Sequence, residues 1–410
     1  MIHEVVTARN AIEALRSGVP SRHAVAQLGT TQAHIKDRFE AASDAVAEGR
    51  GADPLVLAAN FGAGKSHLLE YFQALAERAN FVTAYLVVSP EMLLGNPHLV
   101  LKAIAESARP PGRTGKALRE LSADLGTSSR GFSELRLWAR DADIRDRFRA
   151  LLHLYEEFRA DEELRTQILD DIEGKPLRKT LIKQKLKEIG QVAAYDLTGP
   201  RNPLLAHDRI RLLARFFRAC GCNGLVVLFD ELERLARCTL KQRIAAYEEI
   251  GWWQTVAQTP GSSILPVFAM TSGFVENTVV AGKHDETRFA AAASGPDENE
   301  SERNGQRGIA LLKAPPLRLT PPTPEQEEEV RYRIKAIYEQ AYGVSVPTLP
   351  SARTDVRTSI RADIRRWITL WDLYRYDPAY APDVQEIAVE FDEREVPEDV
   401  ATQAAFEEYE

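Results

Sequence analysis

The stretch VLAANFGAGKSHLLEYF, residues 56–72, is the part of the chain that decides its fold. An apolar run is followed by a glycine turn, by Lys65 next to Ser66, and by leucines and aromatics at helical spacing. A strand, a glycine turn and a helix in this order direct backbone N–H groups and the positive end of a helix toward one point, which binds phosphate. The motif G-x-x-x-x-G-K-[ST] is typical of such loops, and here Ala59 occupies its first position.

The residue types of this loop predict a nucleotide site. Lys65 would reach the β- and γ-phosphates of ATP, and the Ser66 hydroxyl would bind Mg²⁺. A methyl group at Ala59 is tolerable if the φ angle of that residue remains negative. The alternative is a glycine turn before a helix whose lysine is solvated. The residues expected to contact the phosphates are Asn60, Phe61, Gly62, Ala63, Gly64, Lys65, Ser66 and His67.

The second signal of a nucleotide site is the acidic pair that ends the apolar run LVVLFDE at residues 225–231. Ligands of open α/β sheets bind at the carboxyl ends of the strands, where Asp230 and Glu231 stand. We predict that Asp230 supports Mg²⁺ and that Glu231 is the general base that orients the attacking water. The alternative is a capping box in which both acids favour the start of the next helix. Glu233 is either another acid of the site or a surface charge of that helix, and the surface charge is the favoured interpretation.

The adjacent Asp–Glu pair favours one class of nucleotide enzyme. A GTPase would show an N-K-x-D guanine-reading motif, which the sequence lacks. A glutamate beside the magnesium aspartate indicates ATPases with an extra central strand, which include the AAA+ proteins. These proteins carry a polar sensor at the end of the next strand, where Thr271 and Ser272 stand. A turn that ends the strand explains the same two residues equally well.

Arginines form the second group of expected sensors. Arg361 and Arg365 are four residues apart and share a helix face, so that Arg361 could reach the γ-phosphate. A surface or ion-paired role explains each of these arginines as well. The further candidates are Arg357 and Arg366 in the same segment, and Arg288, Arg303 and Arg307 as an arginine finger for a neighbouring subunit.

The whole chain predicts an α/β fold. We expect a P-loop NTPase of AAA+-like type, with a parallel sheet, a helical insertion and an all-helical C-terminal lid of winged-helix-like character. Pro266 argues against a fully paired central strand at 262–272. The other expected strands are 54–59, 80–89, 224–231 and 315–319. The expected domains are an N-terminal helical segment (1–50), the ATPase core (51–320) with its insertion (about 100–205) and a mobile loop (281–308), the lid (321–387) and an acidic tail (388–410).

Composition sets limits on the cellular setting. The chain has 410 residues and a net charge of −8, so any contact with nucleic acid must be a local patch. Its three cysteines are too few for a disulfide framework and are interpreted as reduced thiols. The start of the chain has no apolar segment of the kind found in signal peptides, and no apolar run reaches the roughly 20 residues of a membrane span. We therefore expect a cytoplasmic protein without a membrane contact.

One basic segment is a candidate DNA contact. KPLRKTLIKQKLKEIG, residues 175–190, carries six basic residues and a partial apolar face. Such a helix could lay its lysines on the phosphates of double-stranded DNA, in a salt-sensitive and sequence-independent contact. Acidic residues just before the segment, Asp170, Asp171 and Glu173, favour a solvated surface instead. The basic residues in question lie within 175–187.

Taken together, these stretches resemble a known family, the BREX-system ATP-binding domain proteins of the BrxD-like kind, which are similar to origin-recognition-type AAA+ ATPases. The likeness is carried by AIEALRSGVPSRHAVAQLG (11–29) with IKDRFE (35–40), by FGAGKSHLLEYF (61–72) and by LVVLFDELE (225–233). LRLTPPTPEQ at the start of the lid and IRADIRRWITLWDLYR within it also fit, so the likeness spans most of the chain outside the 100–205 insertion. Ala59 departs from the family, which more often has glycine there.

The resemblance implies a role in bacterial defence against phage. It implies partner proteins of the defence system, of the helicase, methylase or nuclease class. A homo-oligomer is a further possible assembly. It also implies that the RSGVP turn lies against adenine, with Val19 and Pro20 packing on the base and Arg16 and Arg22 beside them. The alternative is that this turn only packs a helix onto the ATPase domain.

These observations together predict an ATPase with ATP and Mg²⁺ as ligands, in which Lys65, Glu231, Thr271 and Arg361 act on the γ-phosphate. One alternative is a switch that binds ATP without hydrolysing it. Another is a clamp that uses ATP to close an oligomer around duplex DNA.

Overall fold

The computed structural model describes residues 2–19, 21–142, 144–197, 204–292, 300–349 and 360–379. Its centre is a five-stranded parallel sheet with the order β2-β3-β4-β1-β5. The strands are β1 (Leu55–Ala59), β2 (Val82–Val87), β3 (Leu225–Asp230), β4 (Ile264–Thr271) and β5 (Leu317–Arg318), each within the segment predicted for it. β4 lies between β1 and β3, so one extra strand separates the glycine-rich loop from the acidic pair.

Pro266 lies in a central strand that is not paired on both sides at the proline, in line with the reservation raised by its missing N–H. β4 pairs with β3 on one side and with β1 on the other. The pairing with β1 begins at Val267, one residue after the proline, whereas Pro266 is matched with Val227 of β3. The shorter β1 therefore leaves the proline opposite only one neighbour.

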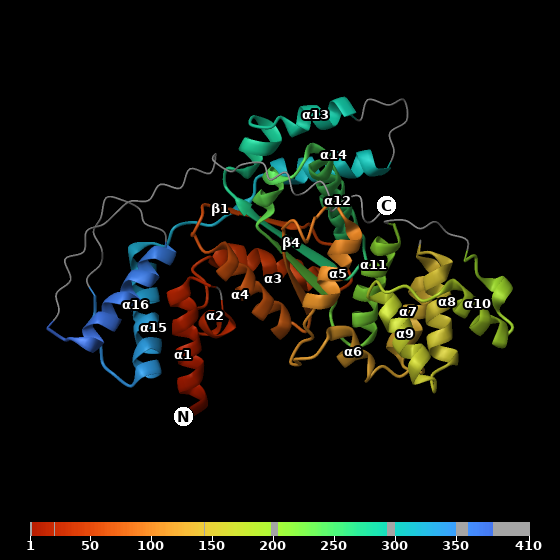
Figure 1. Cartoon of the computed structure of the whole chain (residues 1–410), viewed down its shortest axis with the longest axis horizontal. Helices are drawn as coiled ribbons and strands as arrows, with labels where there is room; N and C mark the ends of the chain where they lie inside the picture. Colours follow the sequence, from red (N-terminus) through yellow and green to blue (C-terminus); the bar gives the residue numbers. More distant parts are fainter. Residues whose placement is uncertain are drawn as a thin grey trace.

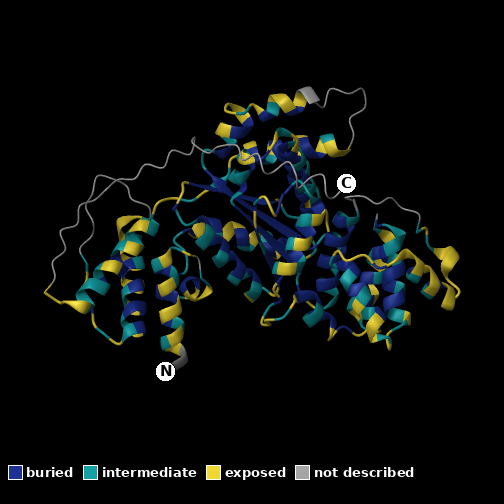
Figure 2. Cartoon of the chain, viewed as in Figure 1, coloured by how far each residue is buried: buried dark blue, intermediate teal, exposed yellow. Residues whose placement is uncertain are grey.

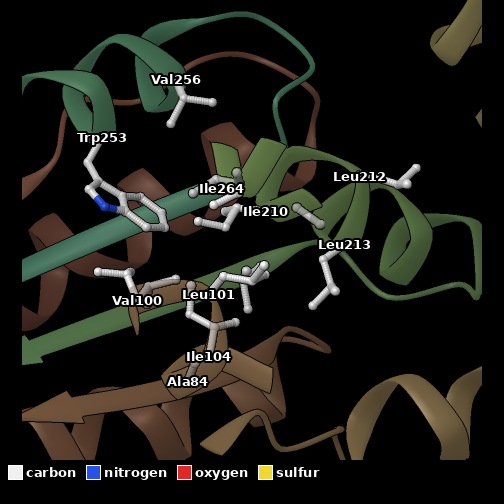
Figure 3. Close-up of a cluster of buried hydrophobic side chains, with 14 of the residues drawn as sticks. Ala84, Val100, Leu101, Ile104, Ile210, Leu212, Leu213, Trp253, Val256 and Ile264 are labelled. Atoms are coloured by element: carbon white, nitrogen blue, oxygen red, sulfur yellow. The ribbon is translucent and has the colours of Figure 1, made fainter. Parts of the chain in front are cut away.

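Helices cover both faces of the sheet, as the continuous apolar character of the strands requires. Alternate residues of each strand enter different cores: Val226 and Leu228 pack with α3 (Ala33–Ala47) and α4 (Lys65–Arg78), whereas Leu225 and Val227 pack on the opposite side. The helices of that side are α5 (Pro97–Ser107), α11 (Leu204–Ala219) and α12 (Leu240–Gln258), and Figure 3 shows Val100, Ile104, Ile210 and Trp253 grouped in this core. Figure 2 shows buried residues along the sheet and on the helix faces that are turned toward it.

The predicted helical insertion forms one end of the molecule (Figure 1). It is continuous with the core of the α5 side of the sheet, because Phe132, Phe148 and Ile168 belong to the same buried cluster as Val82 and Phe229. Its elements are α6 (Ala117–Ser122), α7 (Arg130–Asp141), α8 (Asp146–Glu157), α9 (Glu162–Ile172), α10 (Lys179–Glu188) and the short 3₁₀ helix η1 (Val192–Ala194).

The segment 281–308 was expected to be a mobile loop, but its described part is mostly helical. A short π-helical segment, η3 (Val275–Val280), is followed by α13 (Asp285–Ala292) and α14 (Glu300–Lys313). Asp285 is completely buried and accepts hydrogen bonds from Arg243 and Tyr247 of α12. The polar sequence concealed these helices because their stability comes from close packing on α12 rather than from an apolar repeat.

Glycines allow α12 and α14 to approach each other. A Cβ atom placed on Gly308 would lie 2.0 Å from the Tyr247 carbonyl oxygen, and one placed on Gly251 would lie 1.8 Å from that of Asn304. The obstacle is backbone in both cases, so neither side can yield without moving a helix.

We therefore expect Gly308→Ala to lower the free energy of unfolding by about 1–3 kcal/mol through overpacking. The measurement is the thermal unfolding midpoint, which should fall by several degrees. Gly126→Ala is the matched control, because a Cβ atom there would meet nothing within 4 Å. Equal midpoints for the two variants would contradict the close packing of α12 on α14.

The N-terminal and C-terminal helices together form a third core, at the opposite end from the insertion (Figure 1). Ala11 and Ile12 of α1 (Ile2–Ser17) pack with Tyr338 of α15 (Pro324–Tyr342) and Trp371 of α16 (Ile360–Tyr376). α2 (Arg22–Leu28) joins this core through Ala24 and Leu28, whereas α3 packs on the sheet.

One hydrophobic core unites parts of the expected segments 1–50 and 321–387, and α3 lies outside that core. The described residues of the lid form two helices and contain no strand, so a winged-helix character finds no support in them. The acidic tail at 388–410 lies outside the described residues. Among the described helices, none is long and apolar enough to cross a membrane.

Candidate functional site

The glycine-rich loop joins β1 to α4 in the predicted order. Gly62 and Gly64 have φ angles of 76° and 99°, a left-handed region that favours glycine. A Cβ atom on Gly64 would meet nothing within 4 Å, so its φ angle rather than space requires glycine there. Ala59 is buried at the end of β1 and is not among the described residues with positive φ, so its methyl group is compatible with the turn.

Lys65 starts α4 and is only 8% exposed. Its ammonium nitrogen donates a hydrogen bond to the Ala59 carbonyl oxygen at 3.2 Å and lies 3.9 Å from Oε1 of Glu233. A solvated surface lysine, the alternative raised by the sequence, would be far more exposed. The charge of Lys65 is instead held inside the loop.

Ser66 and Asp230 meet across the sheet edge. The Ser66 hydroxyl donates a hydrogen bond to Oδ2 of Asp230 at 2.8 Å, and the Tyr85 hydroxyl of β2 donates to the same oxygen at 2.6 Å. Burial, followed by the charge of Asp230, raises the pKa of Tyr85, so Tyr85 stays a donor at neutral pH. Tyr85 was missed by the sequence reasoning, and its place in the apolar run of β2 gave no signal for it.

Glu231 follows β3 in the left-handed conformation, with φ 59° and ψ 41°. Its carboxylate forms an ion pair with Arg234 of the 3₁₀ helix η2 (Leu232–Arg237), and its backbone N–H donates to Asp230 Oδ1 at 2.8 Å. A non-glycine residue in this region is uncommon and stores some strain. The turn separates the two carboxylates, with Asp230 buried and Glu231 about one-third exposed.

Glu233 lies in the site, and its interpretation as a surface charge is wrong. Its Oε2 accepts a hydrogen bond from the Thr271 backbone N–H at 3.1 Å, while Oε1 faces Lys65. Burial raises the pKa of Glu233, and the charge of Lys65 opposes that rise. η2 turns this side chain inward because 3₁₀ geometry differs from the α-helical spacing assumed from the sequence. Thr271 itself ends β4 opposite Ala59, 6% exposed.

A cavity of roughly 140 Å³ that is partly open to solvent adjoins the loop. Gly62, Gly64 and His67 form one side of it, and Leu15, Leu28, Val330 and Ile364 give it an apolar wall. A mainly apolar lining with a few polar groups is typical of sites for small organic ligands. The wall comes from four separate segments, α1, α2, α15 and α16, so sequence reasoning found only part of it.

Val19 lines this cavity and is 58% exposed, so the predicted RSGVP turn does lie beside the glycine-rich loop. Pro20 lies outside the described residues. Arg16 turns away to Asp372 of α16, and Arg22 pairs with Glu77 of α4. His67 contacts the Gly29 carbonyl oxygen through Nε2 at 2.9 Å, and burial lowers the pKa of its imidazole. His67 therefore joins the loop to α2, and its Nε2 is not directed at a phosphate.

Arg361 also lines the cavity, with its guanidinium carbon 5.5 Å from the Phe61 ring centroid and its aliphatic stem against Gly18. Arg365 is exposed on the same helix, and Arg357 lies outside the described residues. Arg288, Arg303 and Arg307 are exposed on α13 and α14. The structure thus brings Lys65, Ser66, Asp230, Glu231, Thr271 and Arg361 to one region of the molecule.

The donor set at Ser66 and Asp230 fits Mg²⁺, which prefers oxygen ligands and keeps several waters or phosphate oxygens. Within the described residues, no three His, Cys, Asp or Glu side chains gather as a metal site. A magnesium ion here would therefore take its remaining ligands from the nucleotide and from water.

Comparison with protein families gives one match. The family model described as BREX system ATP-binding protein BrxC/D matches residues 5–118 and 140–357. This match includes the glycine-rich loop, the acidic pair and most of the insertion, and it ends before Arg361. The likeness therefore extends into the insertion, which was expected to fall outside it. No curated protein and no solved structure matches the chain.

Proposed function

The chain belongs to the family of BREX system ATP-binding proteins BrxC/D, and on this premise we propose that it is an ATPase whose hydrolysis of ATP depends on Mg²⁺. Membership implies ATP binding within a phage-defence system, with other proteins of that system as partners. The observation that carries the proposal is the hydrogen bond between Ser66 and Asp230, because it joins the loop serine to the acidic strand end at 2.8 Å.

In the proposed complex the adenine base occupies the apolar cavity beside Val19 and the phosphates lie on the loop at the start of α4. The free N–H groups and the dipole of α4 favour negative charge there. Lys65 binds the β- and γ-phosphates. Ser66 and Asp230 would hold Mg²⁺, which would supply positive charge beside the phosphates when bound.

Glu231 orients the water that attacks the γ-phosphate. For this it must leave Arg234, its ion-pair partner in the structure. Exposed ion pairs are weak, about 0–1 kcal/mol, so this rearrangement costs little. Thr271 is the polar sensor at the end of β4 in this proposal. The extra strand β4 between β1 and β3 supports assignment to the AAA+ class.

Double-stranded DNA is a second proposed ligand, bound by α10. Lys175 and Arg178, just before α10, and Lys179, Lys183 and Lys187 within it are exposed. Lys175 pairs with Asp170, and Lys185 pairs with Glu188 and Asp161. Five exposed cations on one short segment support a contact with phosphates that weakens steeply with salt.

The test of the proposal is ATP binding by calorimetry and phosphate release at steady state, each with and without Mg²⁺ and double-stranded DNA at two salt concentrations. Magnesium-dependent release supports the ATPase. ATP binding without turnover in any condition would favour the alternative, a switch that binds ATP without hydrolysing it. DNA binding that depends on ATP and on oligomer formation would favour a DNA-loading clamp.

Arg361 provides a specific prediction. We expect Arg361→Ala to weaken ATP binding about 10-fold, because a charge-assisted hydrogen bond to the γ-phosphate contributes about 1.5–3 kcal/mol. Affinity for ADP, which lacks that phosphate, should change less. Arg365→Ala is the matched control, since it removes the same charge from an exposed position one turn away. Equal losses for ATP and ADP would contradict a γ-phosphate contact.

A further inference from the structure

Glu233 connects the phosphate-binding lysine with the end of β4. Oε1 of Glu233 lies 3.9 Å from Lys65 Nζ, and Oε2 accepts the Thr271 N–H at 3.1 Å. The side chains of Lys65 and Glu233 are only 8% and 24% exposed. One carboxylate therefore faces both the cation of the loop and the backbone of the predicted sensor strand.

A second route joins the same groups through the Ala59 carbonyl oxygen. That oxygen accepts hydrogen bonds from Lys65 Nζ and from the Ser272 N–H, both at 3.2 Å. Lys65, Glu233, the end of β4 and the end of β1 thus form a closed ring of polar contacts. A movement of Lys65 changes the contacts on both sides of the ring.

The ring supplies the buried ammonium group of Lys65 with partners. A buried ammonium is costly unless it is paired and hydrogen-bonded. Glu233 and the Ala59 carbonyl oxygen supply these two partners. A triphosphate on the loop offers the same ammonium several anionic oxygens, so it competes directly with Glu233.

We propose that Glu233 is the counter-ion of Lys65 in the nucleotide-free protein and that phosphate binding transfers Lys65 from this carboxylate to the nucleotide. The transfer changes the hydrogen bond that Glu233 accepts from the Thr271 N–H. This inference rests on the proposed nucleotide function of the loop. Glu233 is a positioning residue in this scheme: it signals phosphate occupancy to the end of β4, from which η3 and α13 continue. The ligand feature that it senses is the phosphate chain and not the base.

The contact itself is tested without nucleotide by a double-mutant cycle with Glu233→Gln and Lys65→Met, each chosen to remove charge while keeping length. We expect Glu233→Gln to lower the urea unfolding midpoint in the wild-type background, because it leaves Lys65 without its counter-charge. In the Lys65→Met background the same change should leave the midpoint equal or raise it. Equal decreases in both backgrounds would overturn the inference.

The transfer is tested by binding of a non-hydrolysable ATP analogue and of adenosine. Without the competing carboxylate, Glu233→Gln should bind the ATP analogue about 5-fold more tightly than wild type, a coupling of the size seen for contacting charges. Its affinity for adenosine, which has no phosphate, should stay unchanged. Glu276→Gln is the binding control, because it removes an equal charge from an exposed acid of η3 that has no contact with Lys65 among the ion pairs of the described residues.

The outcomes separate the inference from the function on which it rests. A wild-type protein that binds neither ligand would contradict the proposed function, and the transfer would fall with it. A wild-type protein that binds both ligands, with ATP-analogue affinity unchanged in Glu233→Gln, would overturn the transfer alone. Equal changes for the ATP analogue and adenosine, or for Glu233→Gln and Glu276→Gln, would also overturn it.

Discussion

Lys65→Met should lower the affinity for ATP about 100-fold, because charge-assisted hydrogen bonds to phosphate oxygens contribute about 3 kcal/mol. Methionine keeps an unbranched apolar stem in a position that is only 8% exposed. The loss therefore reports the ammonium group rather than its packing. Calorimetric titration with ATP and Mg²⁺ measures it directly.

The control for this experiment is Lys183→Met on the exposed face of α10, which removes the same charge far along the sequence from the loop. It should leave ATP affinity unchanged. A folded Lys65→Met protein with wild-type ATP affinity would contradict the phosphate site. Circular dichroism of both variants tests whether they are folded. This check is needed because Lys65→Met removes the cation that faces Glu233.

Glu231→Gln should slow ATP hydrolysis by about 10²–10⁴-fold, the contribution expected of a general base. ATP affinity should remain close to that of wild type, because Glu231 lies at the strand end and pairs with Arg234 rather than with the loop lysine. Single-turnover phosphate release separates the chemical step from binding. The effect on rate without an effect on affinity identifies an interaction made in the transition state.

Glu276→Gln is a suitable control for Glu231→Gln, because Glu276 is an exposed acid of η3. It should release phosphate at the wild-type rate. If Glu231→Gln hydrolyses ATP as fast as this control, Glu231 does not act as the base. Binding of ATP by all three proteins would then leave the phosphate site intact while removing the proposed mechanism.

Much of the sheet could be predicted because its strands are marked by local sequence. Short apolar runs buried on both faces are distinctive, and glycines with a lysine and serine announce the turn after β1. The carboxyl ends of parallel strands share one edge, so the sequence alone was enough to place Asp230 and Lys65 together. The contact between Ser66 and Asp230 is the geometric expression of that rule.

Other features left no local signal. The polar composition of α13 and α14 concealed these helices, and Gly251 and Gly308 let α14 reach the backbone of α12. Similarly, Glu233 looked like a surface acid of an α-helix, whereas the short 3₁₀ turn of η2 directs it to Thr271 and Lys65.

The sequence by itself therefore determined the strand segments, the glycine-rich loop and the acidic pair that ends β3, because each of these depends on residues close together in the chain. Only the tertiary structure decided the cavity, whose wall comes from α1, α2, α15 and α16. It also decided the hydrogen bond that Oε2 of Glu233 accepts from the Thr271 N–H. These contacts join segments that are up to hundreds of residues apart, as Arg16 and Asp372 do. Their geometry follows from burying several amphipathic helices in one core, and no local pattern encodes which helices will meet.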